Sequence, residues 1–118
     1  MKISEHFNRY EFACKCGCGF DTVDEETLAV LESVRERFDA PVTINSGCRC
    51  AAYNKEIGGA IRSQHVLARA ADITVKNTPA YLVYQHLIDT FPGKYGFGKY
   101  ETFTHVDTRS DGPARWEG

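Results

Sequence analysis

The sequence predicts an α+β fold in which helices pack beside a small antiparallel sheet. Two segments carry apolar residues at helical spacing, 24–38 and 78–91. Two short runs are rich in β-branched residues, 41–45 and 72–75. Two further short segments are expected to pair as strands, 94–98 and 103–107. With 118 residues, the chain is expected to form a single domain, 1–118, with one core.

The first half begins with a segment, Ser4–Cys18, that is expected to dock on the body through Phe7, Tyr10 and Phe12. Asp24 should cap the helix that follows, whose first turn is acidic, as the helix dipole favours. Its core-facing stripe is Leu28, Leu31, Val34 and Phe38. The strand at 41–45 leads into the loop 46–49, and a short helix at 51–57 ends at a glycine pair.

The second half continues with a strand that begins at or just before Asp72. Thr78 as a cap and Pro79 at the first helical position predict the next helix start. Its apolar stripe is Ala80, Val83, Tyr84, Leu87 and Phe91. His86 falls off this stripe, so it is expected to be solvated, as is His6.

The candidate chemistry lies around the second predicted strand and near the C-terminus. His65 precedes Asp72 by seven residues, in the loop that enters the strand. An imidazole and a carboxylate together suit a borderline divalent ion, zinc above all. Alternation places His105 and Asp107 on one strand face, where burial is costly unless something pairs them. His105 alone fits a solvated strand equally well, but beside the first pair it is expected to be the third ligand.

The spacing of these residues resembles the signature motifs of a known family. Ser63, His65, Ala70 and Asp72 match the Ser-x-His-x-x-Gly-x-Ala-x-Asp signature of the zinc D-Ala-D-Ala peptidases, and His-Val-Asp-Thr-Arg at 105–109 is similar to the closing motif of the phage-type branch. The similarity runs from about Phe7 to Trp116. It implies the Hedgehog/DD-peptidase fold. One departure is Ala68, which replaces the usual glycine and would be strained if the position needs a positive φ.

The resemblance also implies roles for individual residues. Zn²⁺ held by His65, Asp72 and His105 would leave a fourth position for water. Arg49, sixteen residues before His65, resembles the arginine that contacts a substrate carboxylate or the oxyanion. Ser63 either binds a substrate carboxylate or caps its own turn.

The general base is the least defined role. Many family members carry an acid three residues before the last zinc histidine, where this chain has Thr102. Two carboxylates remain nearby, Asp107 and Glu101. We favour Asp107, either as the base or as a residue that orients His105, because it belongs to the matching motif.

Five cysteines stand at 14, 16, 18, 48 and 50. Their odd number and lack of Cys-x-x-Cys spacing argue against a disulfide framework or a zinc ribbon. Buried free thiols that act as small hydrophobes are expected, with a second, structural metal as the alternative.

Bulk properties restrict the function classes. A net charge of −2 excludes a strong electrostatic footprint for nucleic acid, and no apolar run reaches the roughly 20 residues of a membrane span. The N-terminus lacks a secretion signal, so synthesis in the cytoplasm and release to the cell wall are expected.

The expected function is a monomeric zinc metallopeptidase that cleaves stem peptides or cross-bridges of bacterial peptidoglycan, as a phage or prophage endolysin or virion enzyme. The main alternative is an inactive, zinc-containing cell-wall or protein binding module of the same fold. A structural-zinc protein built on the cysteines is a third reading.

Overall fold

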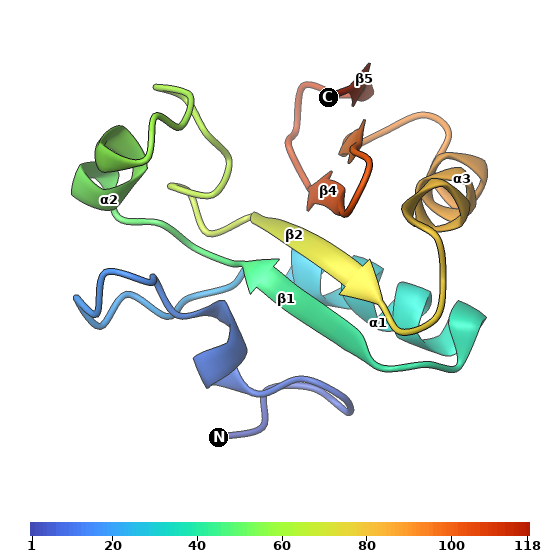
Figure 1. Ribbon diagram of the computed structural model, residues 1–118, viewed down its shortest axis with the longest axis horizontal. Helices are drawn as coiled ribbons and strands as arrows, with labels where there is room; N and C mark the ends of the chain where they lie inside the picture. The colour runs from blue at the N-terminus through green and yellow to red at the C-terminus, as the bar shows by residue number, and fades with distance from the viewer.

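The computed structural model describes residues 1–118, and its centre is a five-stranded sheet with the strand order β1-β2-β4-β3-β5 (Figure 1). The strands are β1 (Val42–Ser46), β2 (Ala70–Val75), β3 (Gly96–Lys99), β4 (Thr104–Asp107) and β5 (Ala114–Glu117). All neighbours are antiparallel except β3 and β5, which run parallel. The α+β prediction is confirmed.

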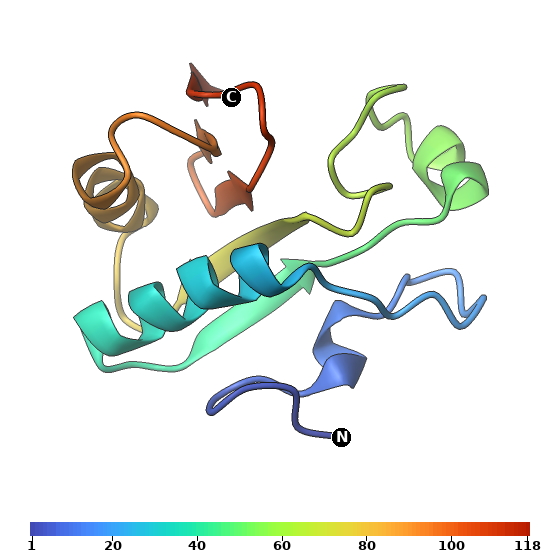
Figure 2. The same cartoon turned by 180° about the vertical axis from the view of Figure 1, so that it is seen from behind.

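The helices are α1 (Glu25–Phe38), α2 (Ala51–Glu56) and α3 (Ala80–Thr90), with a short 3₁₀ helix, η1 (Arg9–Phe12), near the N-terminus. Figure 2 shows α1 running across the sheet, with α3 beside the strands at the other end. Alternate strand residues such as Ala71, Ile73 and Val106 face these helices and are buried with them in one core. None of the helices combines the length and apolar character that a membrane crossing requires.

The start of α1 follows the prediction, whereas the start of α3 does not. The Asp24 carboxylate accepts hydrogen bonds from the N–H groups of Glu26 and Thr27. At α3, Pro79 occupies the cap position and Thr78 makes no capping bond. Thr78 forms a bridge back to Val75, and its hydroxyl donates to the carbonyl of Lys76. The prediction that Thr78 caps the helix is wrong because the turn after β2 uses that residue.

The N-terminal segment docks through two of its three predicted aromatic residues. Phe7 and Phe12 are fully buried, but Tyr10 is 72% exposed. In a 3₁₀ helix of three residues per turn, positions two apart point in different directions, so Phe12 faces the core and Tyr10 faces solvent.

Two histidines expected to be solvated have partners instead. The His6 ring lies 2.7 Å from a carboxylate oxygen of Glu32 on α1. The His86 ring packs edge-on against Phe38, and its burial lowers the His86 pKa below its ordinary value. His6 thus connects the N-terminal segment to α1, and His86 connects α3 to α1. The sequence pattern did not predict either contact.

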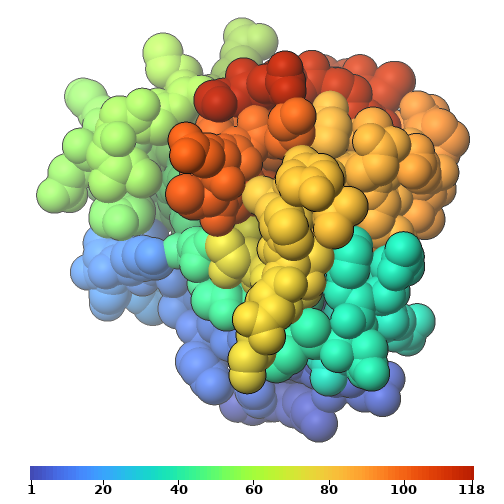
Figure 3. All heavy atoms as spheres, turned by 45° about the vertical axis from the view of Figure 1, so that its right-hand side comes forward, coloured from blue at the N-terminus to red at the C-terminus, as the bar shows by residue number.

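Strand β5 has no counterpart in the prediction. Its sequence, Ala-Arg-Trp-Glu, alternates apolar and charged residues, but four residues are too short a run to predict a strand, and three of the four are only partly buried. It pairs with β3 and covers that edge of the sheet. Figure 3 shows the C-terminal residues, in red, packed directly on the orange residues of the neighbouring strands.

Candidate metal centre

A row of residues crosses the sheet on the face opposite the helices. Asp72 of β2 pairs with His105 of β4, which pairs with Gly98 of β3, which pairs with Trp116 of β5. A side chain at Gly98 would lie 2.5 Å from the indole nitrogen of Trp116. Its absence leaves room for the Trp116 ring, whose centroid lies 5.1 Å from that of His105.

The loop that enters β2 brings His65 to this row. The His65 side chain is buried, and its Nδ1 lies 2.6 Å from the carbonyl oxygen of Gly47. That carbonyl can only accept, so Nδ1 carries the proton and Nε2 is left with a free lone pair. Nε2 lies 3.4 Å from Oδ1 of Asp72.

The loop also contains the position where the sequence departs from the family signature. Ala68 has φ +59°, in the left-handed region that favours glycine. It is buried, and its carbonyl accepts a hydrogen bond from the N–H of Asp24, the cap of α1. The expected strain at Ala68 therefore lies where the His65 loop meets α1.

One ligand atom from each of His65, Asp72 and His105 lies within 4.8 Å of the other two. Nδ1 of His105 is 2.9 Å from the same Asp72 oxygen that faces His65. Two imidazole nitrogens and a carboxylate oxygen are the donors that borderline divalent metals prefer. The residues present therefore fit such an ion.

Beneath His105 lies a buried ion pair. Nε2 of His105 is 2.7 Å from Oδ2 of Asp107, whose side chain is fully buried. Nε and Nη2 of Arg109 donate to the two Asp107 oxygens at 2.8 and 2.7 Å. A side chain at Gly96 would lie about 2.5 Å from this pair, so the missing Cβ makes the space for it. Asp107 thus holds one nitrogen of His105, and the other nitrogen faces Asp72.

The ionisation of this cluster follows from its hydrogen bonds. Burial alone would raise the pKa of Asp72, but His105 and His65 hold it well below its ordinary range. Burial also opposes the charged form of Asp107, yet Arg109 and His105 lower its pKa to about 2. Burial would lower the pKa of His105, but Asp107 and Asp72 raise it. Both carboxylates are therefore ionised at neutral pH.

The three ligand atoms face an open hollow of about 500 Å³. Three arginines line it, Arg49, Arg62 and Arg109, and Asp72 is its only carboxylate. A larger hollow of about 680 Å³ lies between the end of α1 and α3, but it contains no group of three metal-ligating side chains. The smaller hollow is therefore the candidate site.

Arg49 and Ser63 both line this hollow. Arg49 contacts Asp72, Ser46 and Asn54 at 3.3 to 3.5 Å, so its guanidinium makes several long hydrogen bonds and no close one. The Ser63 hydroxyl accepts from the N–H of His65 at 3.2 Å, which is the turn-capping contact considered above.

Glu101 lies away from the metal ligands. It is exposed in the turn between β3 and β4 and does not line the hollow. Alternation would place Glu101 on the same face as His105 only if the strand extended back to it, but β4 begins at Thr104.

Several residues that line the hollow were given no role from the sequence, among them Tyr100, Arg109 and Trp116. The Arg109 guanidinium carbon lies 5.2 Å from the Trp116 ring, and the Trp116 indole donates to the Tyr100 hydroxyl at 2.9 Å. Arg109 could have been found, because it ends the matching motif two residues after Asp107. Trp116 carried only the weaker signal of being the sole tryptophan.

The cysteines do not behave uniformly as buried thiols. Cys14 and Cys48 are buried, Cys50 is half-buried, and Cys16 and Cys18 are exposed. The expectation of buried thiols is therefore wrong for Cys16 and Cys18, which lie in a surface loop.

The fold and the candidate site together describe an α+β protein in which a His–Asp–His cluster that fits a metal ion lies in an open hollow. A family model described as Peptidase M15 matches residues 5–107, and the chain belongs to this family. The match contains all three candidate ligands and ends at Asp107, short of Trp116. Membership implies the Hedgehog/DD-peptidase fold and suggests a peptidase. A search of curated proteins finds no match.

Proposed function

We infer that this protein is a zinc metallopeptidase of the phage-type branch that hydrolyses peptide bonds in peptidoglycan stem peptides or cross-bridges. One observation carries the proposal: His65, Asp72 and His105 gather their ligand atoms within 4.8 Å at an open, arginine-lined hollow. Catalytic zinc sites use three protein ligands and keep one position open, whereas structural sites are closed.

Zinc, when bound, would act as a Lewis acid on the scissile carbonyl and make water acidic enough to attack near neutral pH. The protein's own contribution is to orient the ligands. Gly47 fixes the tautomer of His65, and Asp107 fixes that of His105. We assign Asp107 to this positioning role because it is fully buried and already bonded to Arg109.

The arginines bear on the substrate class. Asp107 pairs with Arg109, but three guanidinium groups against these two carboxylates, Asp72 and Asp107, still make the hollow suited to a peptide with carboxylate groups. Arg49 is the proposed contact to a substrate carboxylate or to the carbonyl oxygen, because its present hydrogen bonds are long and exchangeable. Ser63 is a weaker candidate, since its hydroxyl already caps the His65 turn.

The competing proposal is a binding module that keeps zinc and has lost cleavage. It is favoured by one observation: Asp72 is the only carboxylate that lines the hollow, so no second acid stands ready as a base. For the peptidase, the natural setting we propose is an endolysin or virion enzyme that acts as a monomer on the cell wall.

Mass spectrometry of purified peptidoglycan fragments incubated with the zinc-loaded protein separates the two proposals. A carboxypeptidase would release one terminal residue, and an endopeptidase would separate two peptides, with one water added for each bond cut. Asp72→Asn should be inactive. Fragments that bind the fully zinc-loaded protein but stay intact would favour the binding module.

A further inference from the structure

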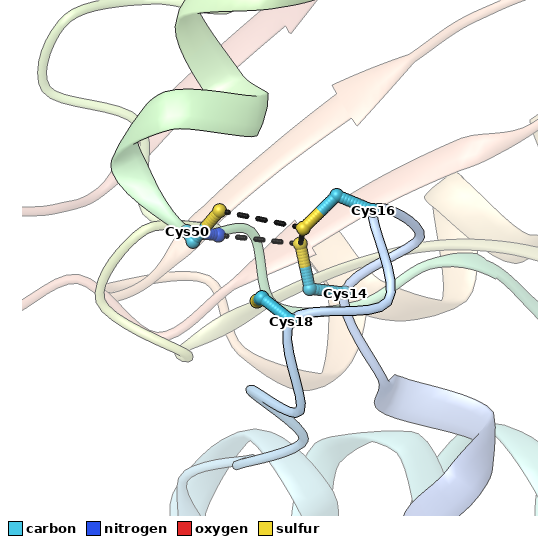
Figure 4. Close-up of side chains that lie close together, drawn as sticks. All are labelled: Cys14, Cys16, Cys18 and Cys50. Atoms are coloured by element: carbon cyan, nitrogen blue, oxygen red, sulfur yellow. Dashed lines mark hydrogen bonds between the residues drawn. The ribbon is translucent and has the colours of Figure 1, made fainter.

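A second cluster of metal-ligating side chains lies outside the candidate site. Cys14, Cys16 and Cys18 come from one loop after η1, and Cys50 comes from the residue that precedes α2 (Figure 4). All four sulfur atoms lie within 4.8 Å of one another. Segments more than thirty residues apart in sequence thus present four thiols to one point.

The backbone of the loop accounts for this convergence. Gly17 and Gly19 have φ of +81° and +93°, a conformation that other residues rarely adopt. A Cβ at either position would meet nothing within 4 Å, so glycine is needed there for conformation and not for space. The N–H of Gly17 donates to the carbonyl of Cys14, and the N–H of Cys14 donates to the carbonyl of Phe20, so the loop that carries the three cysteines is closed on itself.

The sulfur separations suit a shared ion. Sγ of Cys16 lies 3.5 Å from that of Cys14 and 3.6 Å from that of Cys50. With Zn–S bonds of about 2.3 Å, the edge of a tetrahedron of sulfurs is roughly 3.8 Å. A disulfide needs an S–S distance of about 2.0 Å, and all the cysteines are free.

Two backbone groups already donate to these sulfurs. The N–H of Cys50 points to Sγ of Cys14, and the N–H of Tyr53 points to Sγ of Cys50, both at 3.4 Å. Such donors stabilise thiolate, the form that binds metal. Cys48 stands apart, because its buried thiol contacts the carbonyl oxygens of Phe12 and Phe20.

We propose that Cys14, Cys16, Cys18 and Cys50 bind one zinc ion in a closed, structural site that is separate from the His–Asp–His centre. Four sulfur ligands leave no open position, and the thiol protons pass to solvent on binding. The site would clamp the N-terminal loop to the residue next to Arg49. It thereby supports the arginine that lines the hollow without taking part in catalysis.

Zinc per chain, measured by elemental analysis after reductive purification, zinc loading and removal of free metal, tests the proposal. We expect two ions in the parent protein and one in the double variant Cys16→Ser/Cys18→Ser. Both replaced thiols are exposed, so the variant should fold. Cys48→Ser, the matched control, should keep two ions. His65→Ala should keep one, which separates this proposal from the proposed function.

Cobalt(II) substitution identifies the ligands at each site. A thiolate-to-cobalt charge-transfer band should be present in the parent and in His65→Ala, and absent in the double variant. The proposal is overturned if the double variant retains two zinc ions, or if the reduced parent holds a single ion that His65→Ala removes. A reduced parent that still carries a disulfide among the four cysteines would also overturn it.

Discussion

Asp107 is the residue that we propose orients His105 in the candidate metal centre. It is fully buried, it receives two hydrogen bonds from Arg109, and it faces Nε2 of His105. A carboxylate held in this way fixes the ring and increases the basicity of the nitrogen that faces the metal. It does not line the hollow, so direct contact with substrate is not its role.

Asp107→Asn should therefore weaken zinc binding by about 10- to 100-fold, because an amide is a poorer acceptor for the His105 N–H and leaves Arg109 unpaired. Competition with a calibrated zinc chelator measures the change. Glu101→Gln is the control and should bind zinc as the parent does. Unchanged affinity in Asp107→Asn would exclude the positioning role, and an inactive Glu101→Gln that keeps its zinc would identify Glu101 as the base.

Ala68 is a second residue whose replacement has a defined outcome. Residue 68 has φ +59°, so Ala68→Gly removes left-handed backbone strain, which stabilises the folded state. It also removes a buried methyl group and gives the unfolded chain more freedom, and both of these effects destabilise the fold. The gain and the losses should largely offset each other. Ala68→Gly should lie within about 1 kcal/mol of the parent stability. Ala68→Val should lose roughly 2 kcal/mol or more, because a β-branched residue is strongly disfavoured there. Urea denaturation distinguishes the pair, and equal stabilities would contradict the backbone assignment.

At the scale of elements, the N-terminal segment is attached to α1 by one carboxylate. Glu32 accepts hydrogen bonds from the Ser4 hydroxyl and the His6 N–H, and it faces the His6 ring. Burial alone would raise the pKa of Glu32, but these contacts hold it below its ordinary value. A lowered folded-state pKa stabilises the fold above the unfolded-state pKa, and this stabilisation is lost as the pH falls through the folded-state value.

Glu32→Gln should lower the stability at pH 7 by about 1 to 2 kcal/mol, since hydrogen bonds to a charged acceptor are lost. Its stability should also fall less than that of the parent as the pH drops below about 4.5. Thermal unfolding across this pH range measures both effects. Glu36→Gln, at an exposed position on the same helix, is the control and should match the parent.

Elements with a local signal were predictable from the sequence. The apolar stripe and cap of α1 are local patterns, and so are the short strands that carry Asp72 and His105. The pairing of Asp72 with His105 was not, because the two strands are separated by a helix and another strand. Strand β5 was missed because parallel pairing with β3 forms it, while its own alternating sequence is only four residues long.

In the candidate site, too, the residues within sequence motifs were predictable, whereas those brought in by contacts between distant segments were not. His65, Asp72, His105 and Asp107 belong to motifs with fixed spacing, and the structure brings them together. Trp116 reaches His105 only through the β3–β5 pairing and the space above Gly98. The four-thiol cluster depends on loop conformation at Gly17 and Gly19 and on contact with a distant segment. Spacing alone could not indicate it.

At the scale of the whole molecule, the two adjacent residues Arg49 and Cys50 link the His–Asp–His cluster to the thiol cluster. Arg49 reaches Asp72 at 3.5 Å, and the next residue, Cys50, joins the thiol cluster. The hollow, the sheet row and the N-terminal loop are thus connected through residues 49 and 50. We propose that the His–Asp–His cluster is the catalytic centre and that the thiol cluster supports it.

An anomalous difference map at the zinc edge, from crystals grown with zinc under reducing conditions, tests this central claim most directly. We expect a peak about 2.0 to 2.2 Å from Nε2 of His65, an oxygen of Asp72 and Nδ1 of His105, with no fourth protein ligand. A second peak should lie about 2.3 Å from the four sulfurs. A map with density at the sulfurs but none between His65, Asp72 and His105, or with a protein side chain filling the fourth position there, would contradict the assignment of the catalytic centre.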